Sequence, residues 1–145
     1  MIKFIIASLA LIGGSGLAVQ SQINAEFSRR VGVLEGATVS FAVGALALFF
    51  VSFFFGKGNF LLVFSAPKWQ LIGGLFGALF IVINIFSVNL IGVASTFMAV
   101  VIGQLIAGAI IDHFGLFGGV TYPINKSKLI ALAFMFVGIY LFNKS

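Results

Sequence analysis

Residues 71–88 read LIGGLFGALFIVINIFSV, eighteen consecutive positions without a charged side chain. A hydrocarbon core about 30 Å thick is crossed by roughly 20 helical residues, each rising about 1.5 Å. Lipid offers no hydrogen-bond partner to an exposed backbone, so such a stretch must close its hydrogen bonds within a helix. Four further stretches have the same character. The sequence therefore predicts an all-α membrane protein with five transmembrane helices, at residues 3–24, 36–56, 69–89, 93–112 and 127–143.

The composition supports this class. The chain of 145 residues is 61% hydrophobic and only 8% charged, whereas soluble domains average about 25% charged residues. It contains no cysteine, which excludes disulfides, thiolate metal sites and cysteine nucleophiles. We expect a single transmembrane domain over residues 1–145.

The N-terminal stretch has some features of a secretory signal peptide, since Lys3 precedes an apolar run that is followed by small residues. No A-x-A cleavage motif follows, and Gln20, Gln22 and Asn24 continue the segment in helical phase. We therefore interpret this stretch as a retained first helix.

The chain has eight Lys and Arg residues against three acids. The lysines sit at the ends of the expected spans, where cations meet lipid headgroups. The basic excess therefore indicates contact with membrane lipid, and we do not expect nucleic-acid binding. The lysines concerned are Lys3, Lys57, Lys68, Lys126, Lys128 and Lys144.

With five spans, the two termini lie on opposite faces of the membrane. The face that holds the N-terminus carries five of the basic residues, and the other face carries Arg29, Arg30 and Lys144. Orientation follows the Lys and Arg bias of short loops, and a bias this small is easily erased. Two outcomes are open: a cytoplasmic N-terminus in every copy, or insertion in both orientations followed by antiparallel pairing.

Small residues recur four positions apart within the spans. Membrane helices associate by close backbone approach, which such spacing permits. A glycine inside a helix costs about 1 kcal/mol relative to alanine, so we expect these pairs to mark packing contacts in the bundle or at an oligomer seam. The pairs are Gly14 with Ala18, Ser40 with Gly44, Gly73 with Gly77, and Gly103 with Ala107.

Four amide side chains lie inside three of the expected spans. Gln20 and Asn24 share a face of the first helix, Asn84 lies in the third and Gln104 in the fourth. Each alone could form a helix-to-helix hydrogen bond, worth roughly 0.6 kcal/mol on average. Polar groups inside a bilayer usually face a bundle interior or a wet cavity. Because the four lie at comparable depths, we predict that they line a shared polar cavity on a transport pathway.

Ionisable side chains fall at the ends of the spans. Glu26 is the candidate for proton coupling, although an ion pair with Arg29 or Arg30 is the simpler interpretation. Asp112 and His113 are candidates for coupling or gating, and Asp112 more simply ties down the glycine-rich turn that follows. One His and three acids give no metal-ligand spacing, so we expect no metal and no cofactor. Without a nucleophile elbow, a P-loop or an HExxH pair, we expect no enzymatic activity.

Four segments carry a resemblance to a known family. They are GLAVQSQINAEF at 16–27, VSFAVGALAL at 39–48, WQLIGGLFGALFIV at 69–82 and GQLIAGAIIDHFGLFG at 103–118. In these segments the chain resembles the YdcZ-like group of the drug/metabolite transporter superfamily. The resemblance implies a five-helix unit that is half of a ten-helix inverted-repeat transporter fold. A lone unit of this kind would pair antiparallel with a second copy, or with a paralogous subunit, to complete the fold.

The resulting expectation is a transporter of the bacterial inner membrane that works by alternating access. Inverted repeats place their binding site near the midplane, at the repeat interface. The amide groups and the many phenylalanines favour a small neutral or cationic organic solute over an anion. A passive pore of the same architecture and an accessory subunit that needs a partner chain are the alternatives.

Overall fold

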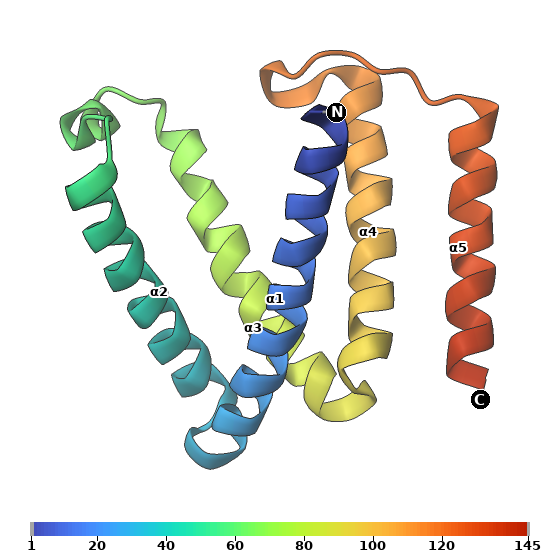
Figure 1. Ribbon diagram of the computed structural model, residues 1–145, viewed down its shortest axis with the longest axis horizontal. Helices are drawn as coiled ribbons and strands as arrows, with labels where there is room; N and C mark the ends of the chain where they lie inside the picture. Colours follow the sequence, from blue (N-terminus) through green and yellow to red (C-terminus); the bar gives the residue numbers. More distant parts are fainter. Residues whose placement is uncertain (1, 145) are drawn as a thin grey trace. The chain divides into compact units, whose positions relative to one another are not determined.

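The computed structural model describes residues 2–144, and over that range it contains helices and no strand. Five long helices are present, as predicted, and each is long and apolar enough to cross a membrane. They are α1 (Ile2–Val31), α2 (Val33–Phe55), α3 (Ile72–Ile91), α4 (Val93–Phe114) and α5 (Lys126–Lys144), shown in Figure 1. Three short 3-10 turns occupy the longer connections: η1 (Phe60–Phe64), η2 (Lys68–Leu71) and η3 (Leu116–Gly118). The predicted all-α class with five membrane-spanning helices is confirmed, and completion of the fold by antiparallel pairing stays a prediction.

The chain divides into two compact units, Met1–Leu90 and Ile91–Ser145. The first contains α1, α2 and α3, and the second contains α4 and α5.

In the first unit, α1 is longer than the sequence indicated. We expected it to end at residue 24, with a connection up to residue 35, but the helix continues to Val31 and only Gly32 separates it from α2. Glu26 forms ion pairs with Arg29 and Arg30, three and four residues later, a spacing that stabilises a helix. Gly32 then adopts a φ of 104°, a conformation essentially restricted to glycine, and reverses the chain.

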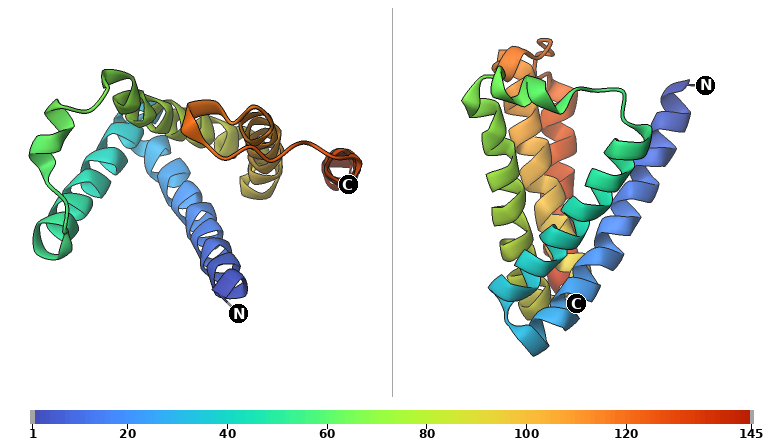
Figure 2. Two further views of the ribbon diagram at one scale, coloured as in Figure 1. Left: turned by 90° about the horizontal axis from the view of Figure 1, so that it is seen from above. Right: turned by 90° about the vertical axis from the view of Figure 1, so that its left-hand side faces the viewer.

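The three helices of this unit converge at one end, where α1 and α3 end and α2 begins (Figures 1 and 2). There α1 and α2 make their closest approach: a Cβ added to Gly36 would lie 3.3 Å from the Cα of Ser28. Toward the opposite end the helices spread apart (Figure 2), and a phenylalanine of α2 reaches a glycine of α3. A Cβ on Gly77 would lie 3.3 Å from the ring of Phe41.

The predicted packing glycines divide in two. Gly77 packs against a neighbouring helix, but a Cβ on Gly14, Gly44, Gly73 or Gly103 would meet no other atom within 4 Å. The small residue that brings α1 and α2 together is Gly36, which the four-residue spacing did not single out. At the remaining glycine positions no neighbouring helix of the same chain packs against the helix surface.

In the second unit, α4 and α5 run antiparallel and side by side (Figure 1). Gly115 ends α4 in the left-handed conformation with a φ of 60°, and η3 and an extended segment lead to α5. The amide of Tyr122 donates to the carbonyl of Asp112 at 2.7 Å, which folds this connection back onto the end of α4.

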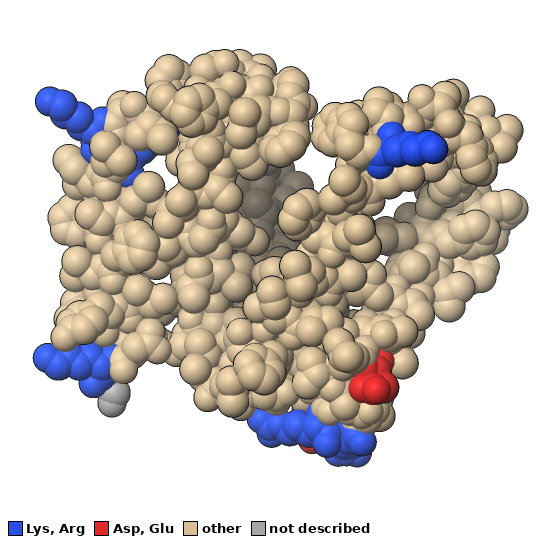
Figure 3. All heavy atoms as spheres, turned by 180° about the vertical axis from the view of Figure 1, so that it is seen from behind, with Lys and Arg blue, Asp and Glu red and all other residues tan. Residues whose placement is uncertain are grey.

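Charged side chains lie near the helix ends, and the middle of every helix is free of them. Figure 3 shows Lys and Arg atoms at the ends of the helices on the face in view. At most 17% of the most apolar window of any span is buried within the chain. Large apolar side chains therefore face outward over the length of each helix, as lipid contact requires.

Candidate functional site

The lower half of α1 carries a buried polar face. Ser21, Asn24 and Ser28 are 6%, 7% and 4% exposed, and Ala25 lies between them fully buried. The spacing of three and four residues places all of them on one side of the helix. Burial in a span is otherwise rare in this unit, so the best-covered part of α1 is lined by hydroxyl and amide groups.

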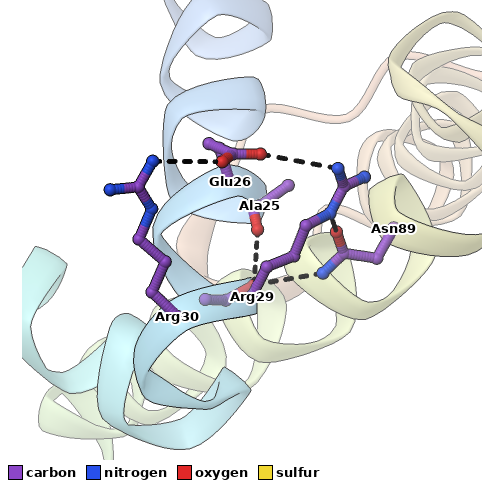
Figure 4. A network of polar contacts seen from close by, with 6 residues as sticks. Ala25, Glu26, Arg29, Arg30 and Asn89 are labelled. Carbon is purple, nitrogen blue, oxygen red and sulfur yellow. Dashed lines mark hydrogen bonds and ion pairs between the residues drawn. The ribbon is translucent and has the colours of Figure 1, made fainter.

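A polar network joins α1 to α3 at the converging end (Figure 4). Arg29 Nε donates to Asn89 Oδ1 at 2.9 Å, and Asn89 Nδ2 donates to Ser28 Oγ at 3.0 Å. The Ser28 hydroxyl in turn donates to the carbonyl of Ala25 at 2.7 Å. Glu26 accepts from this cluster through its ion pair with Arg29 at 3.4 Å.

This network gives Glu26 a structural role. Its two carboxylate oxygens face Arg29 and Arg30, at 3.4 and 3.6 Å, as the simpler sequence interpretation indicated. The pairs are exposed and individually weak. The Asn89 amide bridges Arg29 and Ser28, so the contact that closes α1 onto α3 runs through that amide and not through the carboxylate.

Asn84, on α3, stands apart from this network. It is 3% exposed, and its Nδ2 has no hydrogen-bond partner among the described residues. Asn84 lies seven residues before the end of α3 at Ile91, about 10 Å into the span. A buried amide donor without a partner costs about 1–3 kcal/mol, so an acceptor that reached Asn84 Nδ2 would stabilise this part of α3.

A groove of about 290 Å³ runs between α4 and α5 in the second unit. At one end it is lined by Asp112 of α4 and Lys128 of α5, and Gln104 lines it about two turns further along α4. We call it the α4–α5 groove; its other lining residues are Leu105, Gly108, Ala109, Ala131, Leu132 and Met135. Two polar residues predicted from sequence, Gln104 and Asp112, thus line the same hollow.

His113 holds the connection that follows α4. Its Nδ1 accepts a hydrogen bond from the backbone amide of Ile124 at 3.2 Å, and its ring packs edge-on against Phe114 at 4.7 Å. We expected Asp112 to tie down this turn, and it does so through its backbone carbonyl, which accepts from the amide of Tyr122. The His113 ring adds a second contact to the same connection.

Replacing His113 with alanine removes the side-chain acceptor of the Ile124 amide. We expect His113→Ala to lower the free energy of unfolding by about 1 kcal/mol, as for a single hydrogen bond, and to expose the 115–125 connection to protease. Thermal unfolding in detergent and limited proteolysis measure this. His113→Asn retains an acceptor and is the control; equal protection of both variants and the native protein would contradict the role.

Residues 5–141 match the model of a protein family described as "Putative inner membrane exporter, YdcZ". The chain belongs to the YdcZ family. The match covers all five spans apart from the outermost residues, which confirms the resemblance noted in the sequence and makes the chain a multi-pass protein of the inner membrane. No curated protein and no solved structure matches it.

Within this YdcZ-family chain the four predicted pathway amides differ in burial. Asn24 and Asn84 are buried in the first unit, whereas Gln20 and Gln104 are exposed on α1 and α4. Their assignment to one cavity stays a prediction. Three residues of the polar sites were not predicted: Ser28, Asn89 and Lys128. A lysine at a span end resembles any headgroup anchor, so the sequence does not single out Lys128. The Ser28–Asn89 contact joins residues 61 positions apart, so no local sequence pattern predicts it.

Proposed function

We propose that this protein exports a small neutral or cationic organic solute by alternating access, as an antiparallel homodimer of two five-helix units. Membership in a family described as inner-membrane exporters supports transport. The observation that carries the proposal is Asn84, a buried amide with a free N–H inside a span. Side chains of this kind within a membrane mark solute and ion pathways.

The solute contact is assigned to the amide groups Gln20, Asn24, Asn84 and Gln104. Amides supply donors and acceptors without a net charge, so they suit solutes with hydroxyl, amide or ammonium groups. No carboxylate occupies the middle of a described helix, so the solute site lacks a central proton carrier of its own. The phenylalanine-rich helices add faces that attract organic cations.

The need for a second unit is supported by the surfaces that one chain leaves uncovered. The smooth glycine positions Gly14, Gly44, Gly73 and Gly103 have no neighbour, and close approach at such positions drives association in lipid. The basic residues number five on one face and three on the other, and that small difference allows both orientations to insert.

Two other functions are less well supported. A passive pore would need a ring of charge or a filter of carbonyls, and the described spans hold no charged side chain at mid-depth. An accessory subunit would need a paralogous five-helix partner in place of a second copy. Saturable turnover distinguishes the transporter from the pore, and cross-linking of the purified chain to itself distinguishes the homodimer from the accessory subunit.

Uptake into proteoliposomes over a panel of small neutral and cationic metabolites tests the proposal. We expect saturable transport of at least one class, and a loss of about tenfold in Asn24→Ala and Gln104→Ala, about 1.4 kcal/mol of transition-state binding for each amide. Gln22→Ala, on the exposed face of α1, is the control and should transport normally. Native rates in both pathway variants would refute the site assignment.

A further inference from the structure

The α4–α5 groove has opposite charges at one end that do not pair with each other. Asp112 lies two residues before the end of α4, and Lys128 lies two residues after the start of α5. No ion pair joins them, and the described residues offer the Asp112 carboxylate no hydrogen bond. Lys128 Nζ reaches only the carbonyl of Pro123, at 3.5 Å.

The position of this pair matches the level of lipid headgroups. Both side chains come from the ends of membrane-spanning helices, on the same side of the second unit. A lysine at this depth attracts a phosphate, and a carboxylate attracts an ammonium, both through charge-assisted hydrogen bonds. A ligand that carries a phosphate and an ammonium a few bonds apart satisfies Asp112 and Lys128 together.

Below the charged end, the walls of the groove are mainly apolar. Leu105, Leu132 and Met135 line it, and the small residues Gly108 and Ala109 create the hollow on the α4 side. Leu105 lies seven residues from Asp112, which is about 10 Å along a helix and most of the thickness of one leaflet's hydrocarbon layer. A second hollow of about 340 Å³, which shares Met135 and has no charged lining residue, continues toward the other membrane face.

We propose that the α4–α5 groove binds one zwitterionic phospholipid with a primary ammonium headgroup, of the phosphatidylethanolamine type. Lys128 holds the phosphate, Asp112 holds the ammonium, and an acyl chain follows α4 past Ala109 and Leu105. Gln104 lies eight residues deeper than Asp112, below the headgroup and its ester carbonyls. Gln104 lines this groove and is also assigned to the proposed solute pathway, whereas Asp112 and Lys128 are not among the pathway amides. The lipid site therefore extends the function proposed above.

Native mass spectrometry of the full chain, released from detergent with added lipid, tests the site. We expect phosphatidylethanolamine to bind about fivefold more tightly than phosphatidylglycerol, which lacks the ammonium, since a partly exposed ion pair contributes about that much. Asp112→Asn should erase this preference. Lys128→Gln should weaken binding of both lipids about fivefold. Lys126→Gln removes a neighbouring charge that does not line the groove and should change neither.

The preference is the ratio of the affinities of each variant for the two lipids. A loss of folded protein lowers binding of both lipids equally, so it does not change this ratio. Equal binding of the two lipids to the native chain would overturn the proposal, as would an unchanged ratio in Asp112→Asn. A second copy seated in the groove is the competing occupant. Rapid disulfide formation between two Leu105→Cys chains, with the lipid adducts absent, would establish that copy and exclude the lipid.

Discussion

Asn84→Leu is expected to lower the transport rate more than tenfold while leaving the protein at least as stable as before. The side chain is buried and its N–H donor has no partner among the described residues. Leucine has a similar size and removes a donor whose burial costs about 1–3 kcal/mol when unpaired. If this N–H contacts the solute, the variant can no longer form a hydrogen bond with that polar group of the solute. The transport rate should then fall more than tenfold.

Asn89 on the same helix provides the matched comparison. Its amide makes two hydrogen bonds, to Ser28 and from Arg29, so Asn89→Leu should lower stability by about 1–2 kcal/mol. Two asparagines five residues apart therefore have opposite expected signatures. Thermal unfolding in detergent and proteoliposome uptake, measured on both variants, separate them. Native transport in Asn84→Leu, or a loss of stability equal to that of Asn89→Leu, would make Asn84 a structural residue.

The five spans could be predicted because each is an apolar run of the length a bilayer demands, and no alternative fold satisfies so many apolar residues. The end of α1 could not be located by the same criterion. Residues 25–31 include Glu26, Ser28, Arg29 and Arg30, and this polar content favours a loop over a membrane span. In the structure the helix continues through them to Val31, and ion pairs of Glu26 with Arg29 and Arg30 lie along this last part of it.

The site was predictable only in its residue types. An intramembrane amide is conspicuous in any apolar sequence, so Asn84 and Gln104 could be singled out. Whether such an amide is paired depends on which side chain of another helix reaches it. The Asn89 amide contacts Arg29 and Ser28, whereas Asn84 Nδ2 contacts no acceptor within residues 2–144. The sequence contains no periodic signal that distinguishes the two, because the partners of Asn89 lie on another helix, 60 and 61 positions away in the sequence.

Two sets of substitutions that change the distribution of Lys between the two membrane faces should each fix the chain in one orientation. Each variant alone is expected to lose transport, and co-expression of the two variants is expected to restore it. The chain has five basic residues on the face of the N-terminus and three on the other. Gln70→Lys with Lys144→Gln raises that difference and should fix one orientation. Lys57→Gln and Lys68→Gln, combined with Asn143→Lys and Ser145→Lys, reverse it and should fix the other.

Neither set touches an amide of the proposed pathway or the α4–α5 groove, so altered solute contact does not account for the result. Antiparallel pairing needs both orientations in one membrane. Each variant alone should therefore lose transport at least tenfold, because it supplies only parallel units, and co-expression should restore it. Single-cysteine labelling near the C-terminus reports the orientation: both sides for the native chain, one side for each variant. In the proposed homodimer the second five-helix unit comes from a copy inserted in the opposite orientation. Full transport by a variant held in one orientation would therefore mean that antiparallel pairing is not required.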